Sequence, residues 1–389
     1  MKQTLVIAMI GSKGIPAASG GVERHVEELS TRLVRQGLRV LVYTRRWYTP
    51  RKQSTYKGVE LRPLPSIRTK HLDAITHTFL AILHASIIEH VDIIHLHGIG
   101  PALLTPFIRL IPGMRVVVTY HSPDYYHQKW GWFARTSLRI GEWVACRFAD
   151  ELIVISKELE RHVWAVYRRA TTMIPNGATV VEGRTNIRPI QERLGIARSG
   201  YILYVGRLIP HKGVHTLIAA WKALRTKVPL VIVGEGYHTN QYVQQLNGLA
   251  GSNANIIFVG QRVGKELDAL FRGASVVVQP SQSEGLSLSL LEAMSYAKPV
   301  VVSDIVENRE VMTNPDFWFH STDVNDLVRV LKFVMNRSDA SKAQGRANRD
   351  MIERWYNWNM IALATIERYR NVLVGDHSSS PTVGVGHTA

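Results

Sequence analysis

Cysteine is nearly absent from this chain: Cys146 is the only one among 389 residues. A single cysteine forms neither an internal disulfide nor a cysteine-based zinc site, so a reducing compartment is expected. Long apolar runs are missing too. The nearest candidate, residues 71–90, contains Asp73 and Glu89 and therefore predicts a buried helix in place of a membrane span. The N-terminal apolar run is too short for a signal peptide and predicts a first β-strand.

Acidic residues are few: 31 Asp and Glu stand against 47 Lys and Arg, and the formal net charge is +16. This excess favours an anionic partner, which leaves nucleic acid, an anionic membrane surface and phosphorylated substrates as candidates. The hydrophobic fraction of 46% and the charged fraction of 20% are ordinary for a soluble globular protein and exclude a disordered or collagen-like chain.

Short apolar runs rich in Val and Ile alternate with helical patterns along most of the chain. Continuous apolar strands separated by helices predict a doubly wound α/β fold, in which helices cover both faces of a parallel sheet. The expected strands of the first half are residues 5–10, 40–44, 59–61, 93–96, 116–120, 152–155 and 173–174; those of the second half are 202–205, 230–233, 256–259, 276–279 and 300–302.

A pattern of strand, glycine loop and helix occurs twice. The first strand ends at Gly11 and the second at Gly206. We therefore expect two Rossmann-like domains in tandem, over residues 1–177 and 178–356. A last helix, over about residues 357–373, is expected to pack back on the first domain. The polar residues 374–389 predict a disordered tail.

Two loops of the second domain contain residues suited to a diphosphate. Arg207 and Lys212 lie in one glycine-bounded loop after a strand. The planar guanidinium of arginine can bind a phosphate with two parallel hydrogen bonds, and the ammonium of lysine binds it as a point charge. Glu284 follows another strand and precedes a helix expected to begin near Ser287, whose free N–H groups suit a phosphate, while Glu292 on that helix suits a ribose. Solvated cations and an ordinary capping carboxylate are the alternatives.

The loop before the first helix is rich in glycine, and its sequence from Ser12 to Gly21 is SKGIPAASGG. Gly20 and Gly21 allow the backbone to approach a phosphate or a sugar. The loop matches neither the dinucleotide-binding fingerprint nor the Walker A sequence, so nothing in it indicates NAD or a P-loop nucleotide.

Three segments together resemble the family 4 retaining glycosyltransferases of the GT-B fold: GIPAASGGVERHVEEL, GRLIPHKG and EGLSLSLLEAM. The pieces TYHSPDYY, ADELIVIS, IPNGA and VGEG follow the expected order, and the resemblance covers about residues 3–370. It implies a nucleotide-sugar donor bound in a cleft between two Rossmann-like domains. The opening resembles the subgroup that makes bacterial surface polysaccharides, often rhamnosyl- or mannosyltransferases.

The resemblance also implies roles for individual residues. Arg207 and Lys212 would contact the donor diphosphate, Glu284 the hydroxyls of the donor sugar, and Glu292 the ribose. His121, which follows the strand over residues 116–120, would lie against the donor sugar and help to position or stabilise the reacting centre; a loop histidine with a satisfied hydrogen bond is the alternative. The other expected donor-side positions are Gly20, Gly21, Gly234, Gly285, Leu286 and Ser287, and Asp124 is expected on the acceptor side.

The chain contains no Asp-x-Asp, the sequence with which metal-dependent GT-A enzymes hold Mg²⁺ or Mn²⁺. Arg207 and Lys212 can replace a metal ion in neutralising a departing diphosphate, so neither a divalent metal nor a cofactor is expected. His95 and His97 share one face of a strand, but no third ligand is indicated, and we interpret the pair as packing residues.

The segment from Arg45 to Lys70 combines eight Lys and Arg with one acid and three aromatic residues. Cations mixed with aromatics suit the interface of an anionic bilayer, and a solvated loop is the alternative. The residues assigned to this acceptor or membrane face are Arg45, Arg46, Trp47, Arg51 and Lys52. Trp132 and Phe133, before a helix with Arg135 and Arg139, either extend this face or belong to the core.

The sequence therefore predicts a retaining, metal-independent glycosyltransferase that moves a sugar from a nucleotide-diphosphate sugar to a glycan or polyprenyl-linked acceptor in cell-surface polysaccharide synthesis. A cytoplasmic protein, peripheral on the inner face of the membrane, is expected. A sugar-nucleotide epimerase of the same architecture, which would convert the donor alone, is the alternative enzyme. A basic nucleic-acid-binding protein is a further alternative, although no zinc finger or RNA-recognition sequence is present.

Overall fold

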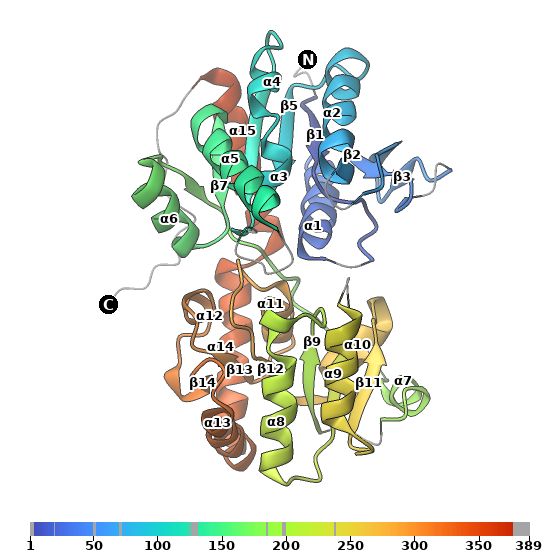
Figure 1. Ribbon diagram of the computed structural model, residues 1–389, viewed down its shortest axis with the longest axis vertical. Coiled ribbons are helices and arrows are strands. Elements are labelled where there is room, and N and C mark those ends of the chain that lie inside the picture. Colours follow the sequence, from blue (N-terminus) through green and yellow to red (C-terminus); the bar gives the residue numbers. More distant parts are fainter. Residues whose placement is uncertain are drawn as a thin grey trace. The chain divides into compact units, whose positions relative to one another are not determined.

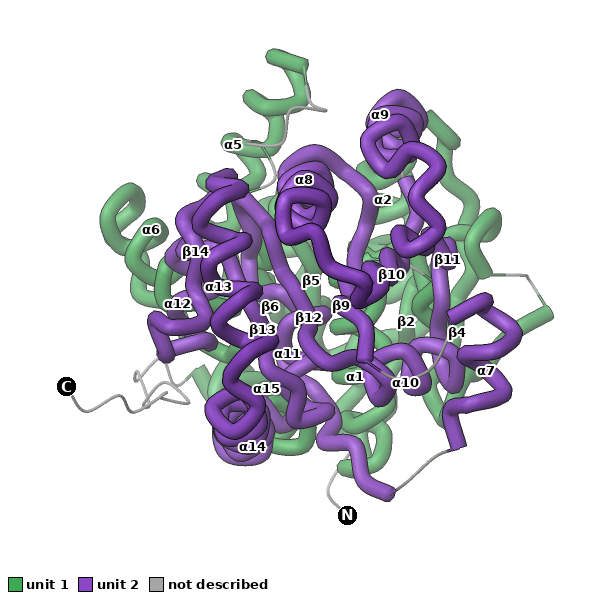
Figure 2. Tube along the Cα trace, turned by 90° about the horizontal axis from the view of Figure 1, so that it is seen from below, with its two compact units in different colours: residues 1–176, 358–389 green, residues 177–357 purple. Residues whose placement is uncertain are grey.

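The structure is a computed structural model. It describes residues 4–18, 20–49, 52–69, 72–123, 125, 131–183, 186–196, 200–236 and 239–375. The chain divides into two compact units, which Figure 2 shows in different colours. Unit 1 comprises Met1–Asn176 and Trp358–Ala389, and unit 2 comprises Gly177–Asn357. Each boundary lies one residue from the expected position.

Unit 1 is built on an eight-stranded sheet with the strand order β3-β4-β2-β1-β5-β6-β7-β8. The strands are β1 (Val6–Ile10), β2 (Arg39–Arg45), β3 (Thr55–Tyr56), β4 (Val59–Leu64), β5 (Ile93–His97), β6 (Arg115–Tyr120), β7 (Glu151–Val154) and β8 (Thr172–Met173). All neighbouring strands are parallel except β3 and β4. Successive residues from Ile7 to Ile10 are fully buried, which shows that both faces of the central strand are covered.

Seven helices in the described part of unit 1 flank this sheet (Figure 1). They are α1 (Gly21–Arg35), α2 (Leu72–Ile87), α3 (Ile99–Ala102), α4 (Thr105–Arg109), α5 (Trp132–Phe148), α6 (Lys157–Tyr167) and α15 (Trp358–Val374). Helix α15 follows all of unit 2 in the sequence, yet it packs on α1 within unit 1. Val374 is the last residue of this helix, and residues 376–389 of the expected tail lie outside the described residues.

Unit 2 contains a six-stranded sheet in the order β11-β10-β9-β12-β13-β14, with all neighbours parallel. The strands are β9 (Tyr201–Val205), β10 (Leu230–Val233), β11 (Ile256–Gly260), β12 (Ala274–Gln279), β13 (Val300–Ser303) and β14 (Trp318–Phe319). The helices are α7 (Arg188–Arg193), α8 (Val214–Leu224), α9 (Asn240–Ala250), α10 (Gly264–Gly273), α11 (Leu288–Ser295), α12 (Val306–Val311), α13 (Val324–Asn336) and α14 (Ser338–Trp355), with 3-10 turns η2 (Pro210–Lys212) and η3 (Pro315–Phe317).

The two sheets share one topological feature that positions the candidate site. In each unit the strand order reverses beside the first strand, between β1 and β5 in unit 1 and between β9 and β12 in unit 2. Open parallel sheets bind ligands beyond the carboxyl ends of the strands at such a switch point. The loops after β9 and β12 contain Lys212 and Glu284, so the topology brings two of the predicted residues to one place.

The structure confirms the predicted α/β fold with two parallel sheets. It differs in the segment from Arg45 to Lys70, part of which forms a hairpin of β3 and β4. Lys57 and Gly58, with φ of 49° and 85°, occupy the turn, and positive φ at both positions suits a two-residue hairpin loop. The short strands β3 and β14 were not predicted, because two residues carry no readable periodicity.

Candidate active site

Lys212 and Glu284 form an ion pair where two loops meet at the switch point of unit 2. Lys212 closes the turn η2 after β9, and Glu284 lies in the loop between β12 and α11. The ammonium of Lys212 donates a hydrogen bond to Oε1 of Glu284, and the two side chains are only 13% and 8% exposed. The structure thus pairs the residue expected to contact the diphosphate with the residue expected to contact the sugar.

Gln279, the last residue of β12, ties Glu284 to the start of α11. Its Nε2 donates to Oε1 of Glu284 at 2.9 Å and to Oγ of Ser287 at 3.1 Å. Ser287 is the N-cap residue of α11, and its hydroxyl accepts from the N–H of Leu290. Sequence reasoning missed Gln279; the available signal was a polar residue that ends an apolar strand.

The surroundings of Glu284 keep its carboxyl group ionised. Burial by itself raises the pKa of this group, but the charge of Lys212 and hydrogen bonds from Lys212, Ser281 and Gln279 outweigh burial and hold the pKa below its ordinary value. An ionised carboxylate only accepts hydrogen bonds. Glu284 is therefore suited to a ligand that presents hydroxyl groups.

Arg207 begins the loop after β9 and has a half-buried side chain. The buried side chain of Tyr204 holds the backbone of Arg207. Its hydroxyl donates a hydrogen bond to the carbonyl oxygen of Arg207 at 3.0 Å. Within the part of the chain that the structure describes, the guanidinium of Arg207 makes no hydrogen bond or ion pair. Counting only the described residues, the site thus offers an anion one cation that has no partner, Arg207, and a second, Lys212, that is paired.

Two glycines allow the loops of this site to approach one another closely. At Gly234, after β10, a Cβ atom would lie 1.8 Å from the carbonyl oxygen of Gly206. At Gly213, where φ is +69°, a Cβ atom would lie 1.9 Å from the carbonyl oxygen of Pro280. Any side chain at either position would push the loop after β9 away from its neighbours.

The other predicted donor-side residues of unit 2 lie at the start of α11. Gly285 and Leu286 belong to the loop, with Leu286 buried, and the helix begins at Leu288, directly after Ser287. Glu292 is half-buried and lies four residues further along the helix, a rise of about 6 Å. These residues therefore extend from the ion pair along one short helix.

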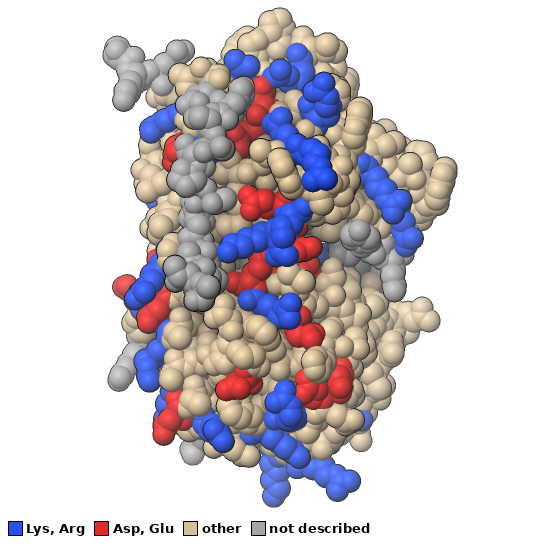
Figure 3. Space-filling model, turned by 90° about the vertical axis from the view of Figure 1, so that its left-hand side faces the viewer, with Lys and Arg blue, Asp and Glu red and all other residues tan. Residues whose placement is uncertain are grey.

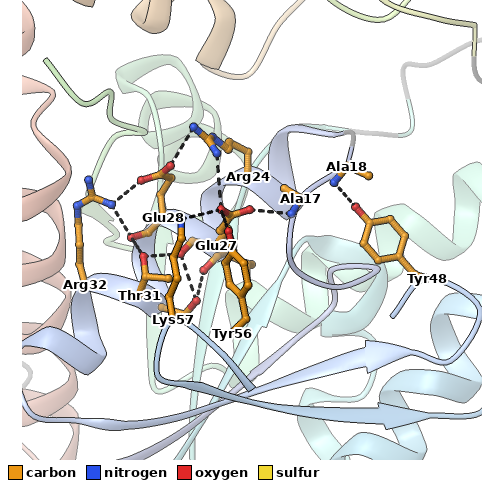
Figure 4. Close-up of polar contacts among 12 residues, drawn as sticks. Ala17, Ala18, Arg24, Glu27, Glu28, Thr31, Arg32, Tyr48, Tyr56 and Lys57 are labelled. Atoms are coloured by element: carbon orange, nitrogen blue, oxygen red, sulfur yellow. Dashed lines mark hydrogen bonds and ion pairs between the residues drawn. The ribbon is translucent and has the colours of Figure 1, made fainter. Parts of the chain in front are cut away.

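In unit 1, two carboxylates of α1 hold the glycine-rich loop that precedes the helix, a role that sequence reasoning missed. Glu27 accepts from the N–H of Ala17 at 2.7 Å and from the hydroxyl of Tyr56 at 2.9 Å (Figure 4). Glu23 accepts from the N–H of Lys13 at 3.1 Å. Residues four apart lie on the same helix face, so this spacing was the available signal.

Gly20 and Gly21 close this loop as the N-cap residue and the first residue of α1. The N–H of Ala18 donates to the hydroxyl of Tyr48 at 2.6 Å, which ties the loop to the segment after β2 (Figure 4). Ser19 lies outside the described residues. The backbone of the loop is thus held from two sides.

His121 follows β6 and is buried among other histidines. Its Nε2 lies 3.3 Å from Nδ1 of His97, and its ring meets the ring of His25 edge-on, with 4.7 Å between the centroids. Burial, with electrostatic interaction with His25 and His95, holds the pKa of His121 well below its ordinary value. Near neutral pH the imidazole is therefore uncharged and both donates and accepts hydrogen bonds.

His95, which we interpreted as a packing residue, is fully buried in unit 1. One ring nitrogen lies 2.6 Å from the hydroxyl of Tyr369 and the other 2.7 Å from the hydroxyl of Thr119. Both nitrogens of His95 thus have hydroxyl partners. Nδ1 of His97, by contrast, lies beside the ring of His121.

The expected acceptor or membrane face is exposed only in part. Arg45 is buried and pairs with Asp73 of α2 at 2.7 Å, so it does not belong to an exposed basic surface. The indole N–H of Trp47 donates to the same carboxyl group at 3.2 Å. Arg46 and Lys52 are exposed, and Arg51 and Asp124 lie outside the described residues.

Part of the positive charge lies in ion pairs. Figure 3 shows one face of the molecule, on which Lys and Arg side chains are interspersed with Asp and Glu. Arg39 and Arg62 both pair with Glu60 and Glu89. Among the helices of the described residues, none is long and apolar enough to cross a membrane.

The two doubly wound units, each with its own parallel sheet, have the GT-B type of fold. Residues 19–180 match the model of Glycosyltransferase Family 4, and residues 187–351 match that of Glycosyl transferases group 1. The chain belongs to glycosyltransferase family 4, a retaining family, and transfers a sugar from a nucleotide sugar. This match favours a transferase over the epimerase and the nucleic-acid-binding protein.

Characterised relatives cover nearly the whole chain. Glycogen synthase of Mycobacterium tuberculosis is 28% identical, with 97% of this chain and 98% of that protein covered. O-antigen chain mannosyltransferase C of Escherichia coli is 25% identical, with coverage of 92% and 96%. The crystal structure of Anabaena HepE in complex with UDP-glucose has a TM-score of 0.78 and 18% identity, and covers 95% of this chain and 100% of that one.

Proposed function

We propose that this chain is a metal-independent retaining glycosyltransferase whose donor diphosphate binds beside the Lys212–Glu284 pair. That pair is the observation that carries the proposal, because a largely buried cation and a largely buried carboxylate next to a helix N-terminus offer separate contacts for a diphosphate and for sugar hydroxyls. Arg207 supplies a second cation. Glu292 accepts hydrogen bonds from the ribose.

In the proposed reaction, the bond from the anomeric carbon to the diphosphate oxygen breaks, and the oxygen of the acceptor hydroxyl bonds to the same face of the sugar. The proton of that hydroxyl passes to the departing diphosphate oxygen. Negative charge grows on the departing diphosphate, where Arg207, Lys212 and the first N–H groups of α11 neutralise it. Glu284 accepts from the sugar hydroxyls while Gln279 holds its carboxylate. These cations do the work of a metal ion, so no divalent metal is required.

The remaining donor and acceptor contacts are proposed from unit 1 and from the relatives. His121, as a neutral imidazole, contacts the donor sugar. A glycan or polyprenyl-linked acceptor in surface-polysaccharide synthesis is supported by the likeness to an O-antigen mannosyltransferase along most of both chains. The complex of Anabaena HepE with UDP-glucose supports a nucleotide-sugar donor and leaves the base of this one to experiment.

Thermal unfolding with UDP, GDP, dTDP and ADP, in the presence of EDTA, tests the donor site. A nucleotide at a hundred times its Kd stabilises the folded protein by about 2.7 kcal/mol. We expect one nucleotide to do so for the wild type and for Glu353→Ala, a control on the exposed side of α14, and not for Glu292→Ala. A shift that requires Mg²⁺ in place of EDTA, or no shift with any nucleotide, would overturn the proposal.

We further propose that the exposed side of α5 rests on an anionic bilayer, where a lipid-linked acceptor would lie. Trp132 is 81% exposed, and Phe133, Ile140 and Trp143 are exposed as well. The exposed cations of this helix are Arg135, Arg139 and Arg147. Spacings of three and four residues put the aromatic and basic side chains on one side of the helix, a pattern typical of helices that lie at a membrane interface.

Sedimentation with lipid vesicles tests this surface. We expect the protein to bind vesicles that contain phosphatidylglycerol, to bind less at high salt, and to ignore pure phosphatidylcholine. The double variant Trp132→Ser/Trp143→Ser should lose binding, while Leu363→Ser, an exposed apolar residue of α15, should keep it. Binding that survives the double variant and is lost when Arg46 and Lys52 are replaced by serine would assign the membrane contact to the segment after β2.

A further inference from the structure

Three buried histidines of unit 1 converge at the carboxyl ends of its central strands. His25 comes from α1, His97 ends β5, and His121 follows β6. Each contributes one ring nitrogen, and these three nitrogens all lie within 4.8 Å of one another. The strands β5 and β6 are parallel neighbours, which is why residues far apart in the sequence meet here.

His25 has an unused lone pair on one ring nitrogen. Its Nδ1 lies 2.8 Å from the side-chain oxygen of Asn176, which only accepts, so Nδ1 carries the proton. Nε2 is then unprotonated, and it is buried with no hydrogen-bond partner in the described part of the chain. Buried polar atoms in folded proteins are rarely left without a partner, so this nitrogen is available to a ligand.

Met9 sets the tautomer of His97 in a similar way. Nε2 of His97 lies 3.2 Å from the thioether sulfur of Met9, which accepts hydrogen bonds but cannot donate them. Nε2 of His97 is therefore protonated and Nδ1 has the lone pair. Nδ1 of His97 lies 3.3 Å from Nε2 of His121. Asn176 therefore leaves Nε2 of His25 unprotonated, and Met9 leaves Nδ1 of His97 unprotonated.

We propose that His25, His97 and His121 form a binding site for Zn²⁺ or a similar transition-metal ion that prefers imidazole. The ligand atoms are Nε2 of His25, Nδ1 of His97, and Nε2 of His121 once its proton resides on Nδ1. Zn–N bonds of about 2.0–2.1 Å place tetrahedral ligand nitrogens about 3.3–3.4 Å apart. The His97–His121 separation already fits, and the His25 ring has to move inward.

The nature of the donor set excludes other common cations. Mg²⁺ and Ca²⁺ prefer oxygen ligands, whereas neutral imidazoles suit zinc, copper and nickel. Three protein ligands leave the fourth position of a tetrahedral ion open. Asn176 donates no ligand itself but orients His25, as hydrogen-bond partners of metal-bound histidines do.

The bound ion is expected to inhibit sugar transfer, because it withdraws His121 from the donor sugar. This consequence rests on the proposed function, in which the reaction needs no metal. Binding of the ion does not rest on it. The two ideas therefore fail separately: nucleotide stabilisation without zinc binding overturns only the zinc site, and zinc binding without nucleotide stabilisation overturns only the donor site.

Equilibrium dialysis of metal-free protein against Zn²⁺, with elemental analysis, tests the site. We expect one tightly held zinc per chain. His25→Asn keeps a donor for Asn176, and His97→Gln keeps one for Met9, so each removes a ligand atom with little other change. Each should weaken binding at least about tenfold. His320→Asn, an exposed histidine paired with Asp304, is the control and should bind as the wild type does.

Equal zinc binding by His25→Asn, His97→Gln and the wild type would overturn the site and assign the ion to other histidines among the 16 of the chain. X-ray absorption of zinc-loaded wild type decides the matter if a variant fails to fold. Three imidazole nitrogens at about 2.0–2.1 Å support the site, and fewer than three overturn it. Hydrolysis or transfer of the donor sugar should fall as zinc binds and recover with a chelator; unchanged turnover would overturn the inhibitory consequence.

Discussion

Lys212 and Glu284 are 72 residues apart in the chain and form a nearly buried ion pair at the ends of the adjacent strands β9 and β12. Each charge offsets the cost of removing the other from water. Both residues also belong to the proposed donor site. A diphosphate would give Lys212 a second anion, and sugar hydroxyls would give Glu284 new donors, so donor binding draws on an arrangement already present.

Breaking this pair from one side should destabilise unit 2. Lys212→Met or Glu284→Gln leaves a buried group without its partner, and we expect the free energy of unfolding in urea to fall by about 3–5 kcal/mol. The double variant should lose less than the sum of the single losses, because no uncompensated charge is left. Sugar transfer should be absent in all three variants.

An exposed ion pair of the same unit is the control for this experiment. Arg188 and Glu192 pair on α7 with side chains 72% and 63% exposed, and Glu192→Gln should cost less than about 1 kcal/mol. Single variants of Lys212 or Glu284 that unfold as the control does would contradict the assigned burial.

Removing Glu27 should loosen the loop before α1. In Glu27→Ala, the N–H of Ala17 and the hydroxyl of Tyr56 lose their acceptor, and each unsatisfied group costs about 1–3 kcal/mol. Amide hydrogen exchange at Ala17 should accelerate. Glu28→Ala, which removes ion pairs with Arg24 and Arg32, should leave exchange at Ala17 unchanged (Figure 4). Equal acceleration in both variants would mean that Glu27 does not hold the loop.

Two glycines of unit 2 should respond in opposite directions to alanine. Gly213→Ala places a methyl group against the carbonyl of Pro280 at a positive φ, and we expect a loss of at least about 2 kcal/mol in the free energy of unfolding. Gly248→Ala, inside α9 with open space around it, should gain about 0.5–1 kcal/mol. A neutral Gly213→Ala would show that the loops after β9 and β12 are further apart.

Buried histidines should make the protein labile in mild acid. Burial lowers the pKa of His25 and His77 to about 4 and that of His95 to about 3. The unfolded chain takes up these protons near pH 6.5, whereas the folded chain does not until pH is far lower. The stability that these residues contribute is thus present above about pH 6.5 and lost as pH falls towards 4.

Urea unfolding between about pH 7 and pH 5 measures this effect. Each such histidine should steepen the fall in the free energy of unfolding by about 1 kcal/mol per pH unit. His77→Asn changes α2, away from the candidate site. It should remove the uptake of one proton on unfolding, and so reduce the pH dependence of the free energy of unfolding by about 1 kcal/mol per pH unit. In His320→Asn the slope should hardly change, since that residue is exposed and Asp304 raises its pKa. A pH-independent wild type would contradict neutral, buried imidazoles.

Much of the fold could be predicted because the local sequence patterns agree with the secondary structure that forms. The apolar runs over residues 5–10, 276–279 and 300–302 became buried parallel strands, since continuous Val and Ile side chains suit a sheet covered on both faces. The hairpin at Lys57 and Gly58 was missed, because its two-residue strand carries no periodicity.

The candidate site was readable only as separate loops. Arg207, Lys212, Glu284 and Glu292 were singled out from their charge and from glycine and strand context. Gln279 and Glu27 were not, because a polar residue at the end of an apolar strand and a second carboxylate four residues along a helix are common patterns that do not indicate their partners. Arg45 was assigned to an exposed face, yet Asp73 of a following helix holds it in a buried pair.

The sequence by itself determined the class of fold, the two-unit organisation and the residue types available for a diphosphate, because strand periodicity, glycine loops and charge are local properties. Only the tertiary structure decided which of these residues touch. Strand order is a property of the whole sheet, and it alone makes β9 and β12 neighbours, or β5 and β6. For that reason the Lys212–Glu284 pair and the cluster of His25, His97 and His121 could not be derived from spacing along the chain.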